Sequence, residues 1–282
     1  MGVADLIALL RKHAPRAFST TAPVCRGTAW IDAPLVVMAA YKKAQADGTM
    51  PCVEASLAKT VACAYGLGVS TVNLVFDGPT RPEKAKTVSA RLVAHTVFAK
   101  RCAVTFSSIL ATDLAMSDRV CTRQLHTFAH AHVSKPFPSY SSIVKEAKCS
   151  TAAKVLVAPH DAEEYIAAHM TADDVAVTID SDALAFGCPH IVQYLGKPNE
   201  TWISLHDVLA GLELTQDQFR TLCVVLGNDF SSRIRGVGPV TCLHAIRTLS
   251  LEQFAERYRA DSTWLDDARR AKEIFELLRI RH

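Results

Sequence analysis

Three apolar, strand-like runs of this chain each end on an aspartate: TAWID at 28–32, NLVFD at 73–77 and VAVTID at 175–180. Segments with helical character separate them, and such alternation favours a mostly parallel, doubly wound α/β sheet. In sheets of this kind the ligand crevice lies outside the carboxyl ends of the strands. We therefore expect Asp32, Asp77 and Asp180 to meet at one edge of one sheet.

The periodicity of apolar residues predicts the other elements around these runs. We predict strands over 28–31, 71–76, 154–157 and 175–179, with edge strands over 190–194 and 201–205. We predict helices over 4–12, 34–46, 53–65 and 216–226, and two or three more after the loop GNDFSSRIRGVGP. The stretch 82–149 is predicted to be mostly helical, with a break at 135–138.

Composition narrows the class of protein. The chain has 282 residues, 49% of them hydrophobic, which suffices for one large core. The net charge of +3 permits a nucleic-acid partner without demanding one. Nine cysteines without a C-x-x-C pair fit reduced thiols in an intracellular protein. No apolar stretch approaches membrane-spanning length, so no membrane partner is expected.

Four more acids belong with the three strand-end aspartates. Asp161 and Glu163 follow the strand KVLV by a short loop, Asp182 lies two residues past Asp180, and Asp229 follows a helix. Clustered carboxylates must be protonated or must recruit cations, because like charges repel. Oxygen ligands without His or Cys select Mg²⁺ or Mn²⁺ over zinc. Two such ions about 4 Å apart can promote phosphodiester hydrolysis.

Taken singly, most of these acids have ordinary explanations. Asp77-Gly78 is a common turn, DAEE at 161–164 suits the first turn of a helix, and Asp229 could cap one. The motif TIDSDALAFG is harder to dismiss, because two carboxylates at the end of a buried strand are costly without a partner. The order of all the motifs together is what points to a catalytic site.

That order resembles the flap endonuclease family over nearly the whole chain. MGVADL resembles the family's opening, and WIDA, VFDGP, APHDAEE, TIDSDALAFG and LCVVLGNDFSSRIRGVGP resemble its successive blocks. The resemblance implies a PIN-like sheet flanked by helices, a helical arch and a C-terminal helix–turn–helix. It also implies two Mg²⁺ ions, for which Mn²⁺ can substitute. The metal ligands that it assigns are Asp32, Asp77, Asp161, Glu163, Asp180, Asp182 and Asp229.

The resemblance further implies a catalytic role for two cations. Lys84 and Arg91 lie seven and fourteen residues beyond Asp77 and resemble the family's basic pair that grips the scissile phosphate. In a regular helix both would share one face, since seven residues make nearly two turns. The stretch 79–125 has eight Lys or Arg against three Asp or Glu, which suits an arch over single-stranded nucleic acid.

IRGVGP at 234–239 is similar to the family's helix–turn–helix that holds a duplex backbone. Glycines there let backbone amides approach phosphate, and the following helix N-terminus favours anions, so the loop carries no base specificity. The family's loop also holds potassium, but Arg233 stands where a serine is usual, which leaves K⁺ binding open. The nucleic-acid contacts implied by the resemblance are Gly2, Arg235, Gly236 and Gly238.

We thus expect one nuclease domain over 1–282, with blocks at 1–100 and 151–282, an arch or insert at 101–150 and the helix–turn–helix at about 226–249. The implied function is metal-dependent 5′ nuclease activity on DNA flaps, junctions or duplex 5′ ends, in replication or repair. The implied setting is a monomer that binds branched or 5′-flapped DNA, without a sliding-clamp tail, in the nucleus or at a site of viral DNA replication.

Three alternatives stay open. An RNA-degrading nuclease of host-shutoff type would share this architecture and its metal chemistry. A haloacid-dehalogenase-like phosphatase would explain VAVTIDSDALAF but not Asp32, Asp77 or Glu163. A non-catalytic nucleic-acid-binding protein would not need the complete set of acids.

Overall fold

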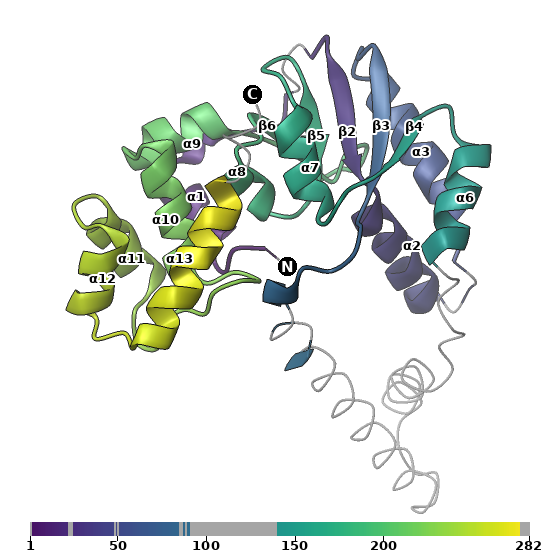
Figure 1. The fold of residues 1–282 in the computed structure, drawn as a ribbon. Helices are drawn as coiled ribbons and strands as arrows, with labels where there is room; N and C mark the ends of the chain where they lie inside the picture. The colour runs from purple at the N-terminus through teal and green to yellow at the C-terminus, as the bar shows by residue number, and fades with distance from the viewer. Residues whose placement is uncertain are drawn as a thin grey trace, which may run out of the picture.

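A computed structural model describes residues 2–21, 25–47, 49, 51–84, 87, 89–90 and 140–276. Within them, seven strands form one sheet in the order β1-β7-β6-β5-β2-β3-β4 (Figure 1). The strands are β1 (Phe18–Ser19), β2 (Thr28–Asp32), β3 (Thr71–Phe76), β4 (Lys154–Val157), β5 (Val175–Val177), β6 (His190–Gln193) and β7 (Thr201–Ser204). The run β6-β5-β2-β3-β4 is parallel, whereas β7 and β1 add antiparallel pairings. The predicted mostly parallel sheet is confirmed.

The strand register aligns the carboxyl ends of the central strands. Asp32 pairs with Val75 across β2 and β3, so Asp77 lies two residues beyond that pair. Ile31 pairs with Val177 across β2 and β5, so Asp180 lies three residues beyond β5's last paired residue. All three aspartates therefore emerge at the same edge of the sheet, as the sequence predicts.

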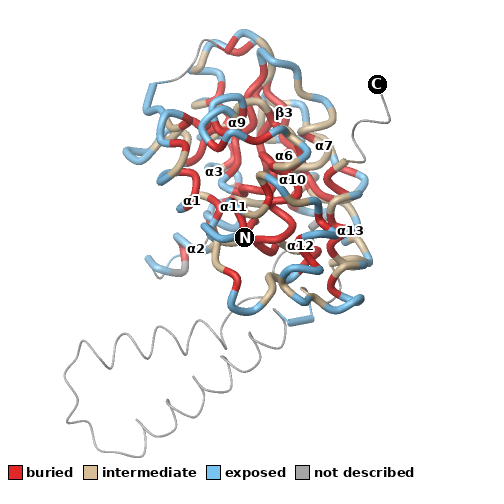
Figure 2. The backbone as a smooth tube through the Cα atoms, turned by 90° about the vertical axis from the view of Figure 1, so that its left-hand side faces the viewer, coloured by how far each residue is buried: buried red, intermediate tan, exposed pale blue. Residues whose placement is uncertain are grey.

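Helices cover both faces of the sheet (Figures 1 and 2). One face packs against α2 (Ala33–Asp47), α3 (Val53–Tyr65) and α6 (Tyr140–Ser150). The other packs against α1 (Leu6–His13), α7 (Ala162–His169), α8 (Asp182–Phe186), α9 (Leu205–Leu212) and α10 (Gln216–Leu226). Because successive strand residues point to opposite faces, Trp30 enters one core and Ile31 the other. Apolar runs without polar alternation are typical of such doubly covered strands.

The C-terminal part adds three helices beside α10 (Figure 1). They are α11 (Pro239–Ile246), α12 (Leu251–Arg257) and α13 (Ser262–Glu276). Capping boxes at Thr215 and Ser250 begin α10 and α12, and Pro239 takes the first position of α11. Two short 3₁₀ helices, η1 (Pro15–Ala17) and η2 (Pro82–Lys84), complete the described elements. No described helix is both long and apolar enough to cross a membrane.

Two details of the strand predictions are wrong. The segments at 190–194 and 201–205 are not edge strands, because β6 lies between β5 and β7, and the two-residue β1 covers the outer side of β7. The strand predicted to reach Ile179 ends at Val177. The Thr178 N–H still donates to the Val192 carbonyl, but the Asp180 N–H turns back to the Thr178 hydroxyl. The predicted arch at 101–150 lies outside the described residues, apart from α6.

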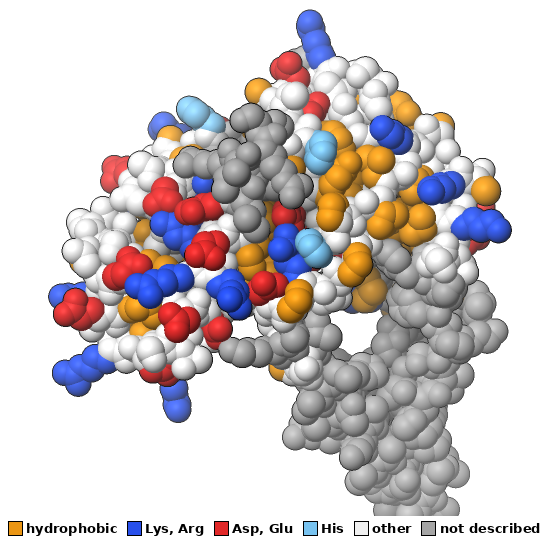
Figure 3. Space-filling model, viewed as in Figure 1, with side chains coloured by type: hydrophobic (Ala, Val, Ile, Leu, Met, Phe, Trp, Pro, Cys, Tyr) orange, Lys and Arg blue, Asp and Glu red, His pale blue; other side chains and the backbone are white. Residues whose placement is uncertain are grey.

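Charged side chains of both signs are mixed on one face of the molecule. On the face drawn in Figure 3, acidic and basic side chains are interspersed over the half that holds α12 and α13, while apolar side chains gather over the other half. The described surface on this face therefore carries no extended field of one sign, in keeping with the small net charge.

Candidate functional site

Seven carboxylates from five separate segments lie at the carboxyl edge of the sheet. Asp32 ends β2, Asp77 follows β3, and Asp180 follows β5. The remaining four are Asp161 at the N-cap of α7, Glu163 in its first turn, Asp182 at the start of α8 and Asp229 after α10. Asp32 is 1% exposed and Asp182 is 4% exposed, so these charges sit well below the surface.

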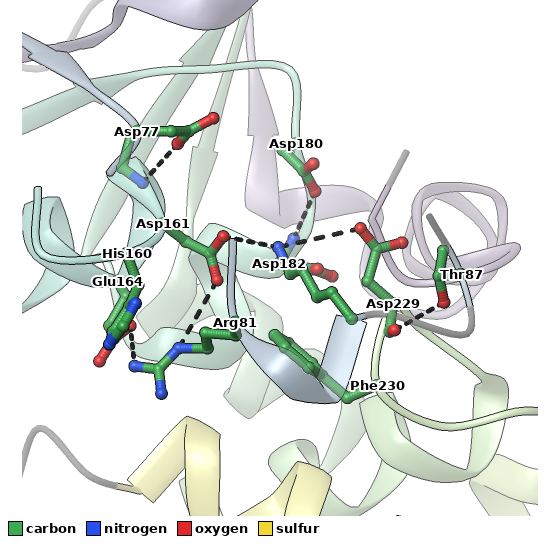
Figure 4. Close-up of polar contacts among 12 residues, drawn as sticks. Asp77, Arg81, Thr87, His160, Asp161, Glu164, Asp180, Asp182, Asp229 and Phe230 are labelled. Atoms are coloured by element: carbon green, nitrogen blue, oxygen red, sulfur yellow. Dashed lines mark hydrogen bonds and ion pairs between the residues drawn. The ribbon is translucent and has the colours of Figure 1, made fainter. Parts of the chain in front are cut away.

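Short hydrogen bonds orient several of these acids (Figure 4). The Ala162 backbone N–H donates to Asp77 Oδ1 over 2.8 Å, and the Asp182 N–H donates to Asp180 Oδ1 over 3.0 Å. The Thr178 hydroxyl donates to Asp32 Oδ2 over 2.9 Å. The bonds to Asp77 and Asp32 come from other segments, and the bond to Asp180 comes from the start of α8, so the fold orients the carboxylates before any ligand arrives.

Burial and crowding make these acids hard to ionise. Burial first, then the nearby charges of Asp77 and Asp180, raise the pKa of Asp32 to about 8. Burial, followed by Asp180 and Asp229, raises the pKa of Asp182 well above its usual range. Burial, followed by Asp32 and Asp180, does the same for the pKa of Glu163. Carboxyl groups in such a cluster gain from a cation among them.

The pKa values of Asp77 and Asp180 are also raised, but a hydrogen bond opposes the increase in each. Burial is the main cause for each, and a backbone N–H opposes it, from Ala162 at Asp77 and from Asp182 at Asp180. These donors favour the ionised carboxylate. The fold thus partly prepares the two acids to carry a charge.

Two basic side chains enter the cluster from the segment that contains η2. Lys84 Nζ lies 2.8 Å from Asp161 Oδ1 and 3.9 Å from Asp229 Oδ2, and 5.0 Å from the centre of the Phe230 ring. Burial alone would lower the pKa of Lys84, but Asp161 and then Glu163 and Asp229 raise it. Arg81 contacts Asp161 and Glu164. The lysine therefore stays protonated beside the acids.

The structure describes most of the residues predicted to contact nucleic acid, but not Arg91. Lys84 lies in η2 and not on a long helix, and Arg91 lies outside the described residues. Gly2 has φ +93°, and an added Cβ would clash with Asp180 Oδ1 and Ser181 Oγ, so Gly2 borders the acids. Gly236 and Gly238 lie on the loop before α11 with open space around them, and Arg235 beside them is exposed.

The Arg233 side chain makes hydrogen bonds to two other segments of the protein. Its Nε donates to the Leu226 carbonyl over 3.0 Å, and its Nη2 donates to Asp5 Oδ2 over 2.7 Å. The side chain thus joins the end of α10 to the N-terminal segment.

Sequence reasoning missed four residues of this site. Thr178, Thr87 and Arg81 contact the acids or their backbone, with Thr87 Oγ1 donating to the Asp229 carbonyl over 2.7 Å, and Glu164 contacts Arg81. Arg81 offered one signal, because it lies three residues before Lys84 in a helical turn. Thr178 offered another, because it is the polar residue inside VAVTID.

The donor set suits a hard divalent cation. Among the described side chains, no group of three His, Cys, Asp or Glu residues is arranged as a finished metal site. However, Asp182 Oδ1 is a buried acceptor with no hydrogen-bond partner among the described residues. Lys84 already brings a positive charge between Asp161 and Asp229. Carboxylate oxygens in this number match the preference of Mg²⁺ and Mn²⁺.

Comparisons with known proteins agree with the motif order. The XPG I-region family model matches residues 153–229, which include five of the seven acids. Flap endonuclease 1 of Glycine max is 35% identical over 130 residues, covering 41% of this chain and 34% of that protein. Flap endonuclease 1 of Saccharomyces cerevisiae (strain YJM789) is 37% identical over 109 residues, covering 36% of this chain and 28% of the relative. Over these residues the chain is similar to flap endonucleases.

Solved structures of similar fold extend the likeness beyond the matched region. The catalytic core of Rad2 in complex with DNA substrate superposes with a TM-score of 0.61 at 17% identity, covering 98% of this chain and 80% of that one. Flap endonuclease-1 from Methanococcus jannaschii gives 0.56 at 17% identity, covering 89% and 78%. These likenesses concern the fold. In sequence, the matched part of this chain spans about a third of the length of the curated relatives.

Proposed function

We propose that this protein is a metal-dependent 5′ nuclease that cuts DNA at flaps, junctions or duplex 5′ ends. One observation carries the proposal: seven carboxylates from five segments converge at one sheet edge, with a lysine among them. Curated relatives named flap endonuclease support it, as does a family structure solved in complex with DNA. A phosphatase of the haloacid-dehalogenase kind would leave Asp32, Asp77 and Glu163 without a role.

The seven acids named above would hold two divalent ions, Mg²⁺ in the cell with Mn²⁺ as a substitute. Bound there, the metal supplies an activated water and charge stabilisation at the phosphate. The chain's own contribution is orientation: Thr178, the Ala162 N–H and the Asp182 N–H set the carboxylate directions. T5 5′-exonuclease, of related fold, has been solved with divalent zinc ions.

Lys84 is proposed to meet the scissile phosphate. Its side chain is 18% exposed, and its ammonium lies between Asp161 and Asp229. A cation held there can stabilise charge that develops on the phosphate. Arg91 is proposed to act with it. Thr87 links this segment to the Asp229 carbonyl, so the loop after α10 and the basic segment are held together.

The loop before α11 is proposed to grip duplex backbone. An added Cβ at Gly236 or Gly238 would meet nothing within 4 Å, so the protein leaves this surface open for close approach. Backbone amides at the start of α11 suit phosphate, and they read shape instead of base sequence. Gly2, at the edge of the acid cluster, and the exposed Arg235 are proposed to add contacts.

The proposed domain covers 1–282, with blocks 1–100 and 151–282, the insert 101–150 and the helix–turn–helix at about 226–249. We further propose that the protein acts as a monomer inside the cell, in the nucleus or at a site of viral DNA replication. Branched or 5′-flapped DNA is its proposed partner. Because the contacts are to phosphates, binding should weaken steeply with salt.

One assay tests this function. Labelled 5′-flap DNA, blunt duplex and single-stranded RNA are compared with and without Mg²⁺, with Asp182→Ala as the control for contaminating nucleases. We expect Mg²⁺-dependent cutting at the flap junction, at a position that stays the same when the flap sequence changes. Preferential cutting of the RNA would instead favour the RNA-degrading alternative. No cleavage of any substrate in Mg²⁺ or Mn²⁺ would contradict nuclease function.

A further inference from the structure

We propose that Arg81 is a positioning residue for metal binding, which holds one oxygen of Asp161 so that the other faces the acid cluster. The inference rests on the proposed function, because Asp161 is there a proposed metal ligand. Arg81 lies outside the motifs that resemble the flap endonuclease family.

Arg81 reaches Asp161 from the side away from Lys84. It precedes Pro82, the first residue of η2, and its side chain is 11% exposed. Its Nη2 bonds Glu164 Oε2, and its Nε lies 3.8 Å from Asp161 Oδ2. Figure 4 shows the guanidinium extended toward both carboxylates. Arg81 therefore spans two residues of the first turn of α7.

The two oxygens of Asp161 have different partners. Oδ1 accepts a hydrogen bond from Lys84 Nζ over 2.8 Å, on the side of Asp229. Oδ2 faces Arg81, and neither Oδ2 nor Arg81 Nε has a hydrogen-bond partner elsewhere among the described residues. A buried N–H and a buried carboxylate oxygen that face one another are each other's available partners. Arg81 thereby holds Oδ2, while Oδ1 stays turned toward Lys84 and Asp229 in the acid cluster.

Glu164 holds the arginine in turn. In the run DAEE, Glu163 lies close to Asp32, Asp180 and Asp77, whose charges add to burial in raising its pKa. Its neighbour Glu164 instead turns to Arg81, because successive residues of a helix point in different directions. In this acidic run, Asp161 and Glu163 therefore face the acid cluster, whereas Glu164 lies outside it and holds Arg81.

An arginine that holds a metal-ligating carboxylate can strengthen metal binding. Groups that hydrogen-bond to a metal-ligating carboxylate set its orientation, and removing one typically lowers metal affinity about 10- to 100-fold. A planar guanidinium can contact Asp161 and Glu164 together, whereas an ammonium is a single point of charge. We therefore expect lysine at position 81 to replace the arginine only in part.

Titration calorimetry with Mn²⁺ alone, on the full chain, tests the inference. We expect Arg81→Ala to weaken Mn²⁺ binding about 10- to 100-fold. Arg81→Lys and Glu164→Gln should weaken it less, because each keeps part of the contact. Arg269→Ala is the matched control: it removes exposed ion pairs to Glu252 at 3.2 Å and Asp266 at 3.7 Å, and should bind Mn²⁺ like the wild type.

Single-turnover cleavage separates positioning from damage to the fold. With Arg81→Ala, raising the Mn²⁺ concentration should restore the rate toward the wild-type plateau, whereas a distorted η2 would lower the plateau at every concentration. Wild-type Mn²⁺ affinity in Arg81→Ala, or in both milder variants if Arg81→Ala does not fold, overturns the role of Arg81. A wild-type chain that binds no Mn²⁺ overturns the proposed function itself, so the two failures are distinguishable.

Discussion

Replacing Asp32 with asparagine should stabilise the metal-free protein. The Asp32 carboxyl is 1% exposed and lies near Asp77 and Asp180, so the folded protein resists its ionisation. Asparagine has nearly the same shape and no charge to bury. Its side-chain oxygen can still accept the hydroxyl of Thr178, which lies 2.9 Å from Asp32 Oδ2. The substitution therefore removes an electrostatic cost while keeping the local hydrogen bond.

The size of the effect follows from the pKa of Asp32. It is about 8 in the folded protein against an ordinary value of 3.8. Between these values the unfolded chain has lost the proton and the folded protein keeps it, so stability falls by about 1.4 kcal/mol per pH unit. At pH 7, about three pH units above the ordinary pKa, Asp32 has lowered the free energy of unfolding by about 4 kcal/mol. Burying the amide N–H groups of asparagine costs about 1–3 kcal/mol, leaving a gain of about 1–3 kcal/mol.

Urea denaturation in EDTA from pH 5 to pH 8 measures the free energy of unfolding of the wild type and of Asp32→Asn. The wild type should lose stability as pH rises through this range, and Asp32→Asn should lose less. Asp266→Asn, at a carboxylate that is 75% exposed, is the control and should follow the wild type. Excess Mn²⁺ should then stabilise the wild type more than Asp32→Asn, because the ligand set is incomplete in the variant. Equal stability and an unchanged pH slope in EDTA would refute the reasoning.

Three further outcomes can be measured with the same protein. Asp182→Ala should slow single-turnover cleavage by orders of magnitude, because a proposed metal ligand is lost. Duplex affinity should stay largely intact, because Asp182 is only 4% exposed and cannot contact DNA; wild-type turnover in Mg²⁺ would contradict the two-metal assignment. Lys84→Ala should slow cleavage about 100-fold and weaken binding less; an equal loss of both indicates an ordinary backbone contact. Gly238→Val should reduce duplex affinity in fluorescence anisotropy without a change in melting temperature, because an added Cβ meets nothing within 4 Å; unchanged affinity would exclude close phosphate approach at this loop.

The fold was predictable wherever one signal dominated. The run TVNLVF is apolar and bounded by turn residues, and β3 (Thr71–Phe76) has the predicted bounds. The segments at 190–194 and 201–205 were assigned correctly as strands but wrongly as edges, because strand order depends on which distant segment covers β7. Local patterns carry no information about a two-residue strand such as β1, whose existence depends on its pairing with Ile203 and Trp202.

For the candidate site, the sequence alone determined the chemistry of the acids and the edge at which they emerge. An aspartate after a buried parallel strand has only one edge to occupy, so Asp32, Asp77 and Asp180 could be brought together from the pattern. The tertiary structure decided the contacts between segments: Thr178 on Asp32, Lys84 between Asp161 and Asp229, and Arg81 between Asp161 and Glu164. Such contacts depend on side-chain directions across the fold, and residues 77 or more positions apart in the chain leave no local trace of their pairing.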